Sequence, residues 1–137
     1  MRGGDVMEPT ARVIHSGSSY QGRQGIPYIA GLTAASAGAT EICMTVATIP
    51  PGARTKAHLH ENIETAVYVI EGEAEMYWGL NLEHHEVGRS GDYMYVGADT
   101  PHVVINRSSV RCVAVVAHSA GDDQEGIVLL PELDARV

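Results

Sequence analysis

Short apolar runs, each closed by residues that favour turns, follow one another from residue 41 to near the end of this chain. The run 41–49 ends at Pro50-Pro51-Gly52, and the run 65–71 ends at Gly72. Short runs bounded in this way are typical of β-strands, and no segment has the apolar period of a helix. The sequence therefore predicts an all-β fold, either a sandwich or a barrel. The segments that we expect to form strands are 41–49, 55–60, 65–71, 74–78, 83–87, 93–96, 103–106, 111–118 and 127–130.

The length of the chain favours a single domain. It has 137 residues, 45% of them hydrophobic, which is enough to bury one core. The first 25 residues are rich in Gly and Ser, and such a terminus is ordered only where another segment holds it. We therefore expect residues 1–25 to be a flexible or strand-exchanging segment and residues 26–137 to form the domain. The small residues of 31–40 predict a loop.

The charge of the chain argues against two classes of partner. The formal net charge is −8 and Lys and Arg form no cluster, so we expect no nucleic acid and no membrane as a partner. No apolar run is long enough to span a membrane, and the N-terminus lacks the apolar core of a secretory signal. A cytoplasmic protein is therefore expected. Cys43 and Cys112 lie in apolar runs without C-x-x-C spacing, which predicts two buried free thiols.

Two histidines one residue apart carry the strongest chemical signal. Side chains on a strand alternate between its faces, so His58 and His60 share a face, and Glu64 joins them if the strand continues without a bulge. Two imidazoles and a carboxylate on one face suit a divalent first-row metal ion. One strand rarely supplies every ligand. The best candidate for a further ligand is His102, which follows a turn and begins an apolar run.

Two longer patterns around these residues resemble the motifs of the cupin superfamily. The stretch GARTKAHLHENIE is similar to the first motif, G-x5-H-x-H-x3-E, and GDYMYVGADTPHVVIN is similar to the second, G-x5-P-x-G-x2-H-x3-N. Gly97 and Asp99 depart from the Pro and Gly of the second motif. The residues that match are Gly52, His58, His60, Glu64, Gly91, His102 and Asn106.

This resemblance, to a small single-domain cupin, implies both a fold and a metal site. The implied fold is a jelly-roll barrel, or double-stranded β-helix, of two antiparallel sheets. The implied site is one divalent transition metal ion, held by His58, His60, Glu64 and His102. These ligands accept Fe²⁺, Mn²⁺, Zn²⁺, Ni²⁺ or Co²⁺, so the sequence does not determine which ion is bound.

The carboxylate ligand can be counted in two ways. Counting forward from the second histidine gives Glu64, whereas counting back seven residues from Gly72, as in much of the family, gives Thr65. Thr is a poor ligand for such metals, so we predict Glu64, with a one-residue bulge or a longer turn before Gly72 that absorbs the extra residue. Glu71 and Glu73 are alternatives, although they flank a turn and are expected to be solvated.

The remaining polar and aromatic residues give weaker signals. His84 and His85 are expected at the surface, and His15 and His118 receive no role. No catalytic residue is assigned. Most aromatic residues of the strands are expected to be structural, with one or two in a pocket, and methionines could form an apolar pocket wall. These residues are Tyr68, Tyr77, Trp78, Tyr93, Tyr95, Met44, Met76 and Met94.

The predicted metal site supports two functional hypotheses. Four protein ligands on a six-coordinate ion leave two positions for water, dioxygen or two oxygens of a substrate. We therefore expect a metal-dependent enzyme, an oxygenase, an isomerase or cyclase, or a lyase, acting on an oxygen-rich small organic molecule. The alternative is a non-catalytic module that binds or senses a small molecule. The runs Val67–Ile70 and Val113–Val116 are apolar on both faces, which predicts a homodimer.

Overall fold

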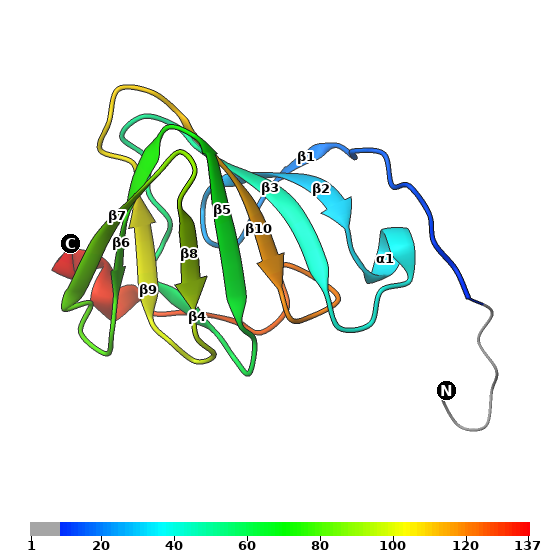
Figure 1. Ribbon diagram of the computed structural model, residues 1–137. Helices are drawn as coiled ribbons and strands as arrows, with labels where there is room; N and C mark the ends of the chain where they lie inside the picture. The colour runs from blue at the N-terminus through cyan, green and yellow to red at the C-terminus, as the bar shows by residue number, and fades with distance from the viewer. Residues whose placement is uncertain (1–8) are drawn as a thin grey trace.

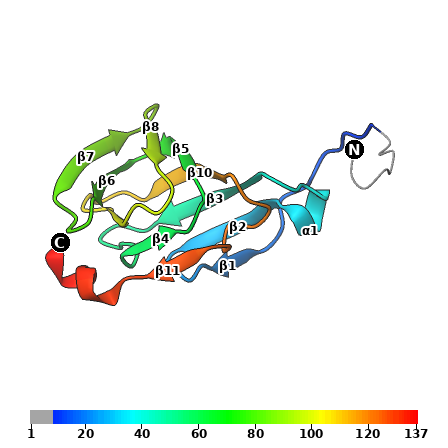
Figure 2. The same ribbon diagram turned by 90° about the horizontal axis from the view of Figure 1, so that it is seen from below.

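Two antiparallel β-sheets face one another across an apolar interior (Figure 1). The structure is a computed structural model that describes residues 9–137. Within that range the larger sheet contains, in spatial order, β1 (Ser19–Gln21), β2 (Pro27–Leu32), β3 (Cys43–Ile49), β10 (Cys112–His118), β5 (Thr65–Glu71) and β8 (Tyr93–Val96). The smaller sheet contains β11 (Ile127–Leu129), β4 (His58–His60), β9 (His102–Ile105), β6 (Glu73–Trp78) and β7 (His84–Arg89). Figure 2 shows the same sandwich from below, with β11 near β4.

The all-β, two-sheet architecture predicted from the sequence is confirmed. Each segment that was predicted as a strand overlaps one of β3 to β11, and every strand pairing is antiparallel. The strands β1 and β2 were not predicted, because residues 19–32 combine several glycines with only short apolar stretches. Among the described residues no helix is long and apolar enough to cross a membrane.

A single helical turn, α1 (Ala34–Ala37), interrupts the segment that was predicted to be a loop. The Thr33 side chain accepts a hydrogen bond from the Ser36 backbone N–H, and the Ser36 hydroxyl accepts one from the Thr33 N–H. The turn ends at Gly38, whose φ of 73° lies in the left-handed region. A turn this short has no apolar period for sequence analysis to detect. A 3₁₀ helix, η1 (Pro131–Arg136), closes the chain.

The N-terminal part of the larger sheet begins before the predicted domain boundary at residue 26. β1 pairs with β2 of its own chain, with Ser19 opposite Ile29, and Gln24 is only 2% exposed. Residues 19–25 are therefore integrated into the fold of this chain. Residues 1–8 of the predicted N-terminal segment lie outside the described residues, and exchange of a strand with a second copy stays a prediction.

Strict alternation along the strands decides which side chains enter the interior. On β3 the residues Cys43, Thr45, Ala47 and Ile49 are buried, while the residues between them are exposed or half-buried. Such alternation is typical of a sheet with one face on the core. Cys112 is buried on the neighbouring strand β10, and both cysteines are free thiols, as predicted.

The outer face of the larger sheet carries two lines of apolar side chains. Strand register places Ile29, Val46, Val115, Tyr68 and Tyr93 side by side across β2, β3, β10, β5 and β8. Tyr68 is 39% exposed and Tyr93 is 79% exposed. Contiguous apolar surface of this kind marks an interaction site more often than a solvated face. The parallel line beside it contains Leu32, Met44, Ala117, Ala66 and Tyr95.

We expect this face to be the contact between two copies in a homodimer. Changing Tyr68, at the middle of the first line, to Glu would place an unpaired charge in the contact, which costs about 3–5 kcal/mol. The dimer should therefore dissociate with a Kd raised by roughly 100-fold or more. Light scattering at micromolar concentration measures the mass. The control Leu80→Glu, at an exposed turn outside these two lines, should leave the mass unchanged, and a monomeric wild-type protein would contradict the prediction.

Candidate metal centre

Three histidine side chains converge on the inner face of the smaller sheet. β4 and β9 are neighbours, and their register sets His58 directly opposite His102. His60 lies two residues along β4, so its side chain points to the same face. Ring nitrogens of the three residues all lie within 4.8 Å of one another. Each residue is at most 4% exposed, so the cluster is closed off from bulk water.

Backbone carbonyls orient two of the three rings. Nδ1 of His58 lies 2.6 Å from the Lys56 carbonyl oxygen, and Nδ1 of His102 lies 2.9 Å from the Thr100 carbonyl oxygen. A carbonyl oxygen can only accept, so each Nδ1 carries the proton and donates it, which leaves the Nε2 lone pair free. This is the arrangement in which a histidine binds a metal ion, with its second nitrogen held by a backbone group.

His60 leaves a buried nitrogen without a normal partner. Its Nδ1 makes no hydrogen bond of ordinary geometry to any residue between 9 and 137, although the Glu125 backbone lies close to the ring. A buried polar atom without a well-formed hydrogen bond is uncommon. Since the Glu125 backbone is the neighbour of Nδ1, Nε2 is the nitrogen of His60 that remains for a metal ion.

Burial keeps the three rings neutral. Loss of solvent is the main reason why the pKa of His102 falls to about 4, and the nearby His60 ring lowers it further. Burial and the His102 ring also hold the pKa of His58 well below its usual range. Burial lowers the pKa of His60 as well, against a smaller opposite effect of Glu125 and Asp123. Near pH 7 the rings are thus in the form that binds metal.

The donor set fits a divalent first-row transition metal. Neutral imidazole nitrogens are ligands that iron, nickel, cobalt, copper and zinc accept. With metal–nitrogen bonds of about 2.1 Å, two ligands of one ion lie roughly 3–4 Å apart. The observed limit of 4.8 Å between ring nitrogens needs only a small adjustment to reach that separation. His58, His60 and His102 together would hold such an ion on one side and leave its other side open.

Glu64 does not lie in this cluster. Its carboxylate Oε2 accepts a hydrogen bond of 2.6 Å from the Tyr95 hydroxyl, and the residue is exposed. The expected strand parity fails because β4 ends at His60 and the chain then turns through Asn62, whose φ is 59°. The next strand belongs to the opposite sheet and begins at Thr65. Alternation of faces cannot be carried across such a turn.

The two alternative carboxylates also lie away from the cluster. Glu71 pairs with Arg111 at 3.1 Å, and Glu73 lies 3.9 Å from Arg89, at the turn between β5 and β6. These side chains are solvated, as expected for residues that flank a turn. Among the described residues, the three histidines are therefore grouped without a carboxylate.

Thr65 and His118 occupy the side of the interior where a carboxylate was expected. Both are buried, they are opposite one another in the register of β5 and β10, and Thr65 Oγ1 lies 2.8 Å from His118 Nδ1. The ring centroid of His118 is 4.7 Å from that of His60. Sequence analysis left His118 without a role. Counting back from Gly72 did identify Thr65, and the inward parity of β10 would have added His118.

The turn before His102 keeps the shape of the motif in spite of its departures. Asp99 stands where the second motif has Gly, and its φ of 60° is in the left-handed region that favours Gly but that Asp tolerates. Its carboxylate accepts a hydrogen bond from the Asn62 backbone, and its N–H donates to the His60 carbonyl. Asn106 is fully buried and donates to the Ile49 carbonyl. The bond from Asp99 to the His60 carbonyl ties the turn to β4.

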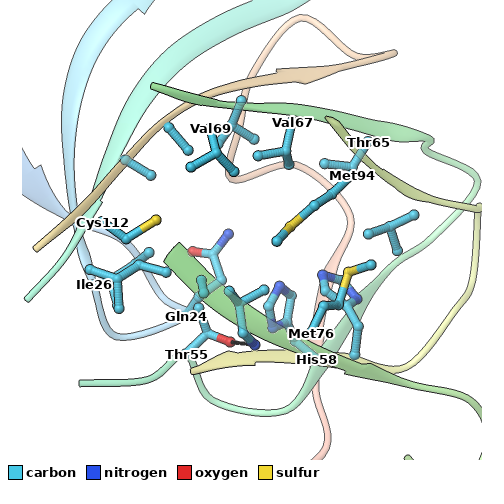
Figure 3. A pocket seen from close by; sticks show the side chains of 18 of the residues that line it. Gln24, Ile26, Thr55, His58, Thr65, Val67, Val69, Met76, Met94 and Cys112 are labelled. Atoms are coloured by element: carbon cyan, nitrogen blue, oxygen red, sulfur yellow. Dashed lines mark hydrogen bonds between the residues drawn. The ribbon is translucent and has the colours of Figure 1, made fainter. Parts of the chain in front are cut away.

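The cluster opens into a small, largely apolar cavity of about 70 Å³. Figure 3 shows Thr55 and His58 on one side of it, and Thr65, Val67 and Val69 of β5 on the other. Met76 and Met94 point into it, as suggested for a pocket wall. Among the described residues, no Lys, Arg, Asp or Glu lines the cavity. The other lining residues are Gln24, Ile26, Tyr28, Ala47, Ile49, His60, Ala74, Val96, His102, Val104, Cys112, Ala114, Val116 and His118.

The structure also shows where the other aromatic, methionine and histidine candidates lie. Met44 lies on the outer face instead of the cavity wall, at 49% exposure. The tyrosine that lines the cavity is Tyr28, which was not among the candidates, and none of those aromatic candidates lines it. His84 and His85 are exposed, as predicted, and stack on Trp78 and Tyr77.

Comparison with known proteins gives one family and many similar folds. The family model described as "Cupin domain" matches residues 45–118. No curated protein matches the sequence. An uncharacterized protein with a double-stranded β-helix domain from Klebsiella pneumoniae subsp. pneumoniae is 19% identical, with a TM-score of 0.62 over 80% of this chain and 84% of that one.

Two solved structures of named enzymes share the fold. The oxalate decarboxylase of Lactobacillus farciminis is 14% identical, with a TM-score of 0.70 over 82% of this chain and 33% of that one. A sugar phosphate isomerase from a cupin superfamily, from Silicibacter pomeroyi, is 19% identical, with a TM-score of 0.59 over 77% of this chain and 71% of that one. Identities this low show a common fold and leave activity undetermined.

The three-histidine arrangement makes a prediction about metal content. Protein incubated with excess Co²⁺ and then desalted should retain about one ion per chain, whereas His58→Ala and His102→Ala should each retain less than a fifth of that. Glu64→Gln should retain as much as the wild type, because the structure places this carboxylate outside the cluster. Elemental analysis measures the content. Loss of metal in Glu64→Gln, with the histidine variants unaffected, would show that the site is misassigned.

The lowered pKa values predict how the metal-free protein responds to acid. The unfolded histidine has a pKa of about 6.5, and His102 in the fold has a pKa of about 4, so the unfolded chain binds more protons between these values. Stability should be greatest above pH 6.5 and fall as the pH is lowered toward 4. Thermal unfolding in a chelator, followed by circular dichroism, measures this. His102→Gln should flatten the decline, and an equal slope in both proteins would contradict the assignment.

Proposed function

This chain belongs to the cupin family, and from that premise we propose that it is a metal-dependent enzyme acting on a small organic molecule. The observation that carries the proposal is the convergence of His58, His60 and His102 in a buried cavity. Burial favours the neutral form of all three rings, and their ring nitrogens lie within 4.8 Å of one another, close to the separation that one ion requires.

The chain's own residues would perform several tasks at such a site. Hydrogen bonds from His58 and His102 to backbone carbonyls fix the ring orientations before anything binds. Apolar side chains, among them Val67, Met76 and Met94, exclude water and lower the local dielectric constant. When bound, a divalent ion supplies Lewis acidity that polarises the oxygens of a ligand beside it. Fe²⁺, Zn²⁺, Ni²⁺ and Co²⁺ suit these imidazole ligands, and Mn²⁺, which favours oxygen ligands, is the fifth candidate.

The size of the cavity and the charge of the metal site limit which substrates can bind. A cavity of about 70 Å³ has room for on the order of five water molecules, so the bound part of the substrate is small. Three neutral ligands would leave both charges of a divalent ion unbalanced in an apolar interior, which favours a ligand that binds through anionic oxygens. The cavity lining described here offers no Lys or Arg to a phosphate group. We therefore favour a small, oxygen-chelating substrate over a sugar phosphate, for an oxygenase, isomerase, cyclase or lyase reaction.

A non-catalytic binding module is the second candidate. It is favoured by one observation: in residues 9–137 no carboxylate reaches the cavity to act as a general acid or base. Such a module would capture the same class of small oxygen ligand without converting it.

We place this activity in the cytoplasm. Cys43 and Cys112 are unpaired and buried, which suits a reducing compartment. The acidic net charge of −8 gives no reason to expect a nucleic acid or a membrane surface as a partner. The proposed partners are the small-molecule substrate and, through the outer face of the larger sheet, a second copy of the chain.

Turnover separates the two candidates. Protein loaded in turn with each of the five metal ions should consume at least one member of a panel of small acids and ketones with 1,2- or 1,3-related oxygens. Consumption should fall roughly 100-fold or more in His102→Ala, because a metal ligand is lost. Mass spectrometry with an oxygen electrode measures this, and His84→Ala is the surface control. Reproducible binding without consumption for every metal would favour the binding module.

A further inference from the structure

His118 approaches the three-histidine cluster from the opposite sheet. It is the last residue of β10 in the larger sheet, while His58, His60 and His102 belong to the smaller sheet. Its side chain is buried, lines the cavity, and lies with its ring centroid 4.7 Å from that of His60. The His118 ring therefore lies on the side of the cluster that the smaller sheet, which supplies the three histidines, does not cover.

Thr65 holds this ring in place. Its hydroxyl lies 2.8 Å from Nδ1 of His118, and the two residues are opposite one another on β5 and β10. A threonine side chain is stiff at χ1, so its hydroxyl is a fixed anchor. Whichever of the two groups donates, the contact occupies Nδ1. It leaves Nε2, which makes no hydrogen bond to a described residue, available on a ring that lines the cavity.

The geometry separates His118 from the metal ligands. Its ring nitrogens do not join the group whose members all lie within 4.8 Å of one another. An atom bound to the ion at about 2.1 Å, and hydrogen-bonded to Nε2 at about 2.9 Å, would place that nitrogen up to roughly 5 Å from the ion. His118 is thus set back far enough to contact a bound molecule.

The surroundings give this nitrogen a specific task. The neighbouring cavity wall on the larger sheet consists of apolar side chains such as Val67, Val96 and Val116. A polar atom of a ligand on this side would lose its hydrogen bonds to water, so a single well-placed partner decides whether it is tolerated. His118 can be that partner through Nε2, because the Thr65 hydroxyl already bonds to its Nδ1.

We propose that His118, held by Thr65, is a positioning residue that hydrogen-bonds through Nε2 to the molecule bound on the open side of the three-histidine site. The inference rests on the proposed metal site, and it narrows the ligand. The preferred molecule carries a second polar atom next to the oxygen that contacts the ion and is apolar beyond it. His118 then selects for that second atom and fixes its direction.

The test uses Co²⁺-loaded protein and acetohydroxamate, a small oxygen chelator with an adjacent N–H group. Visible absorption of the cobalt ion follows binding of this probe, and competition with a chelator gives the Co²⁺ affinity. In His118→Leu the Co²⁺ affinity should stay within about threefold of the wild type, while the probe should bind about tenfold more weakly. In His118→Gln, whose amide reaches a similar position, the probe affinity should largely recover.

Two further variants keep the test independent of folding. Thr65→Val retains the His118 ring and removes only its anchor, so probe binding should weaken about threefold with Co²⁺ affinity unchanged. If His118→Leu does not fold, as judged by thermal unfolding, this variant and His118→Gln decide the question. His84→Leu is the matched surface control and should change neither affinity.

Three results would overturn the inference. Unchanged probe affinity in the folded His118→Leu and Thr65→Val variants would show that His118 has no positioning role. A fall of tenfold or more in Co²⁺ affinity in His118→Leu, with His84→Leu unaffected, would make His118 a fourth metal ligand. Absence of Co²⁺ binding by the wild type would overturn the metal site and the inference together, which the first two results would not do.

Discussion

The antiparallel pairing of β4 with β9 is the contact on which the site depends. It sets His58 opposite His102, and the two-residue period of β4 adds His60 to the same face. A slip of one residue in this register would turn His102 out of the cavity. The turn before β9 guards against such a slip, because Asp99 bonds to the backbone of His60 at the end of β4 and of Asn62 in the turn that follows. The larger sheet then closes over the three rings and removes water from them.

The interior that the two sheets enclose is electrostatically neutral. The described cavity wall has no ionised side chain, and burial holds the imidazoles in their neutral form. A divalent ion held there would receive no charge compensation from the chain, which leaves an anionic ligand to supply it. Glu64, the carboxylate that the first motif suggests, instead accepts a hydrogen bond from Tyr95 at the surface. Thr65 and His118 take the interior position with neutral polar groups.

The sequence predicted the strands and three of the proposed site residues because those features are local. Apolar runs with turn residues at their ends located β3 to β11, and the two motifs located His58, His60 and His102. The expectation for Glu64, which the structure does not bear out, depended on non-local structure. Whether Glu64 or Thr65 faces inward depends on the turn after His60, where Asn62 adopts a positive φ, and the two ways of counting gave different residues there. Alternation along β10 places His118 on the inward face, but its contact with Thr65 depends on the pairing of β10 with β5, which is visible only in the folded sheet.

The direct test of the central claim is a crystal structure of the protein soaked with Co²⁺, with anomalous diffraction recorded at the cobalt absorption edge. The account predicts one anomalous peak per chain, bonded to ring nitrogens of His58, His60 and His102, with the Glu64 carboxylate still at the surface. A peak bound elsewhere, a peak bonded to Glu64, or no peak at saturating Co²⁺ would contradict it.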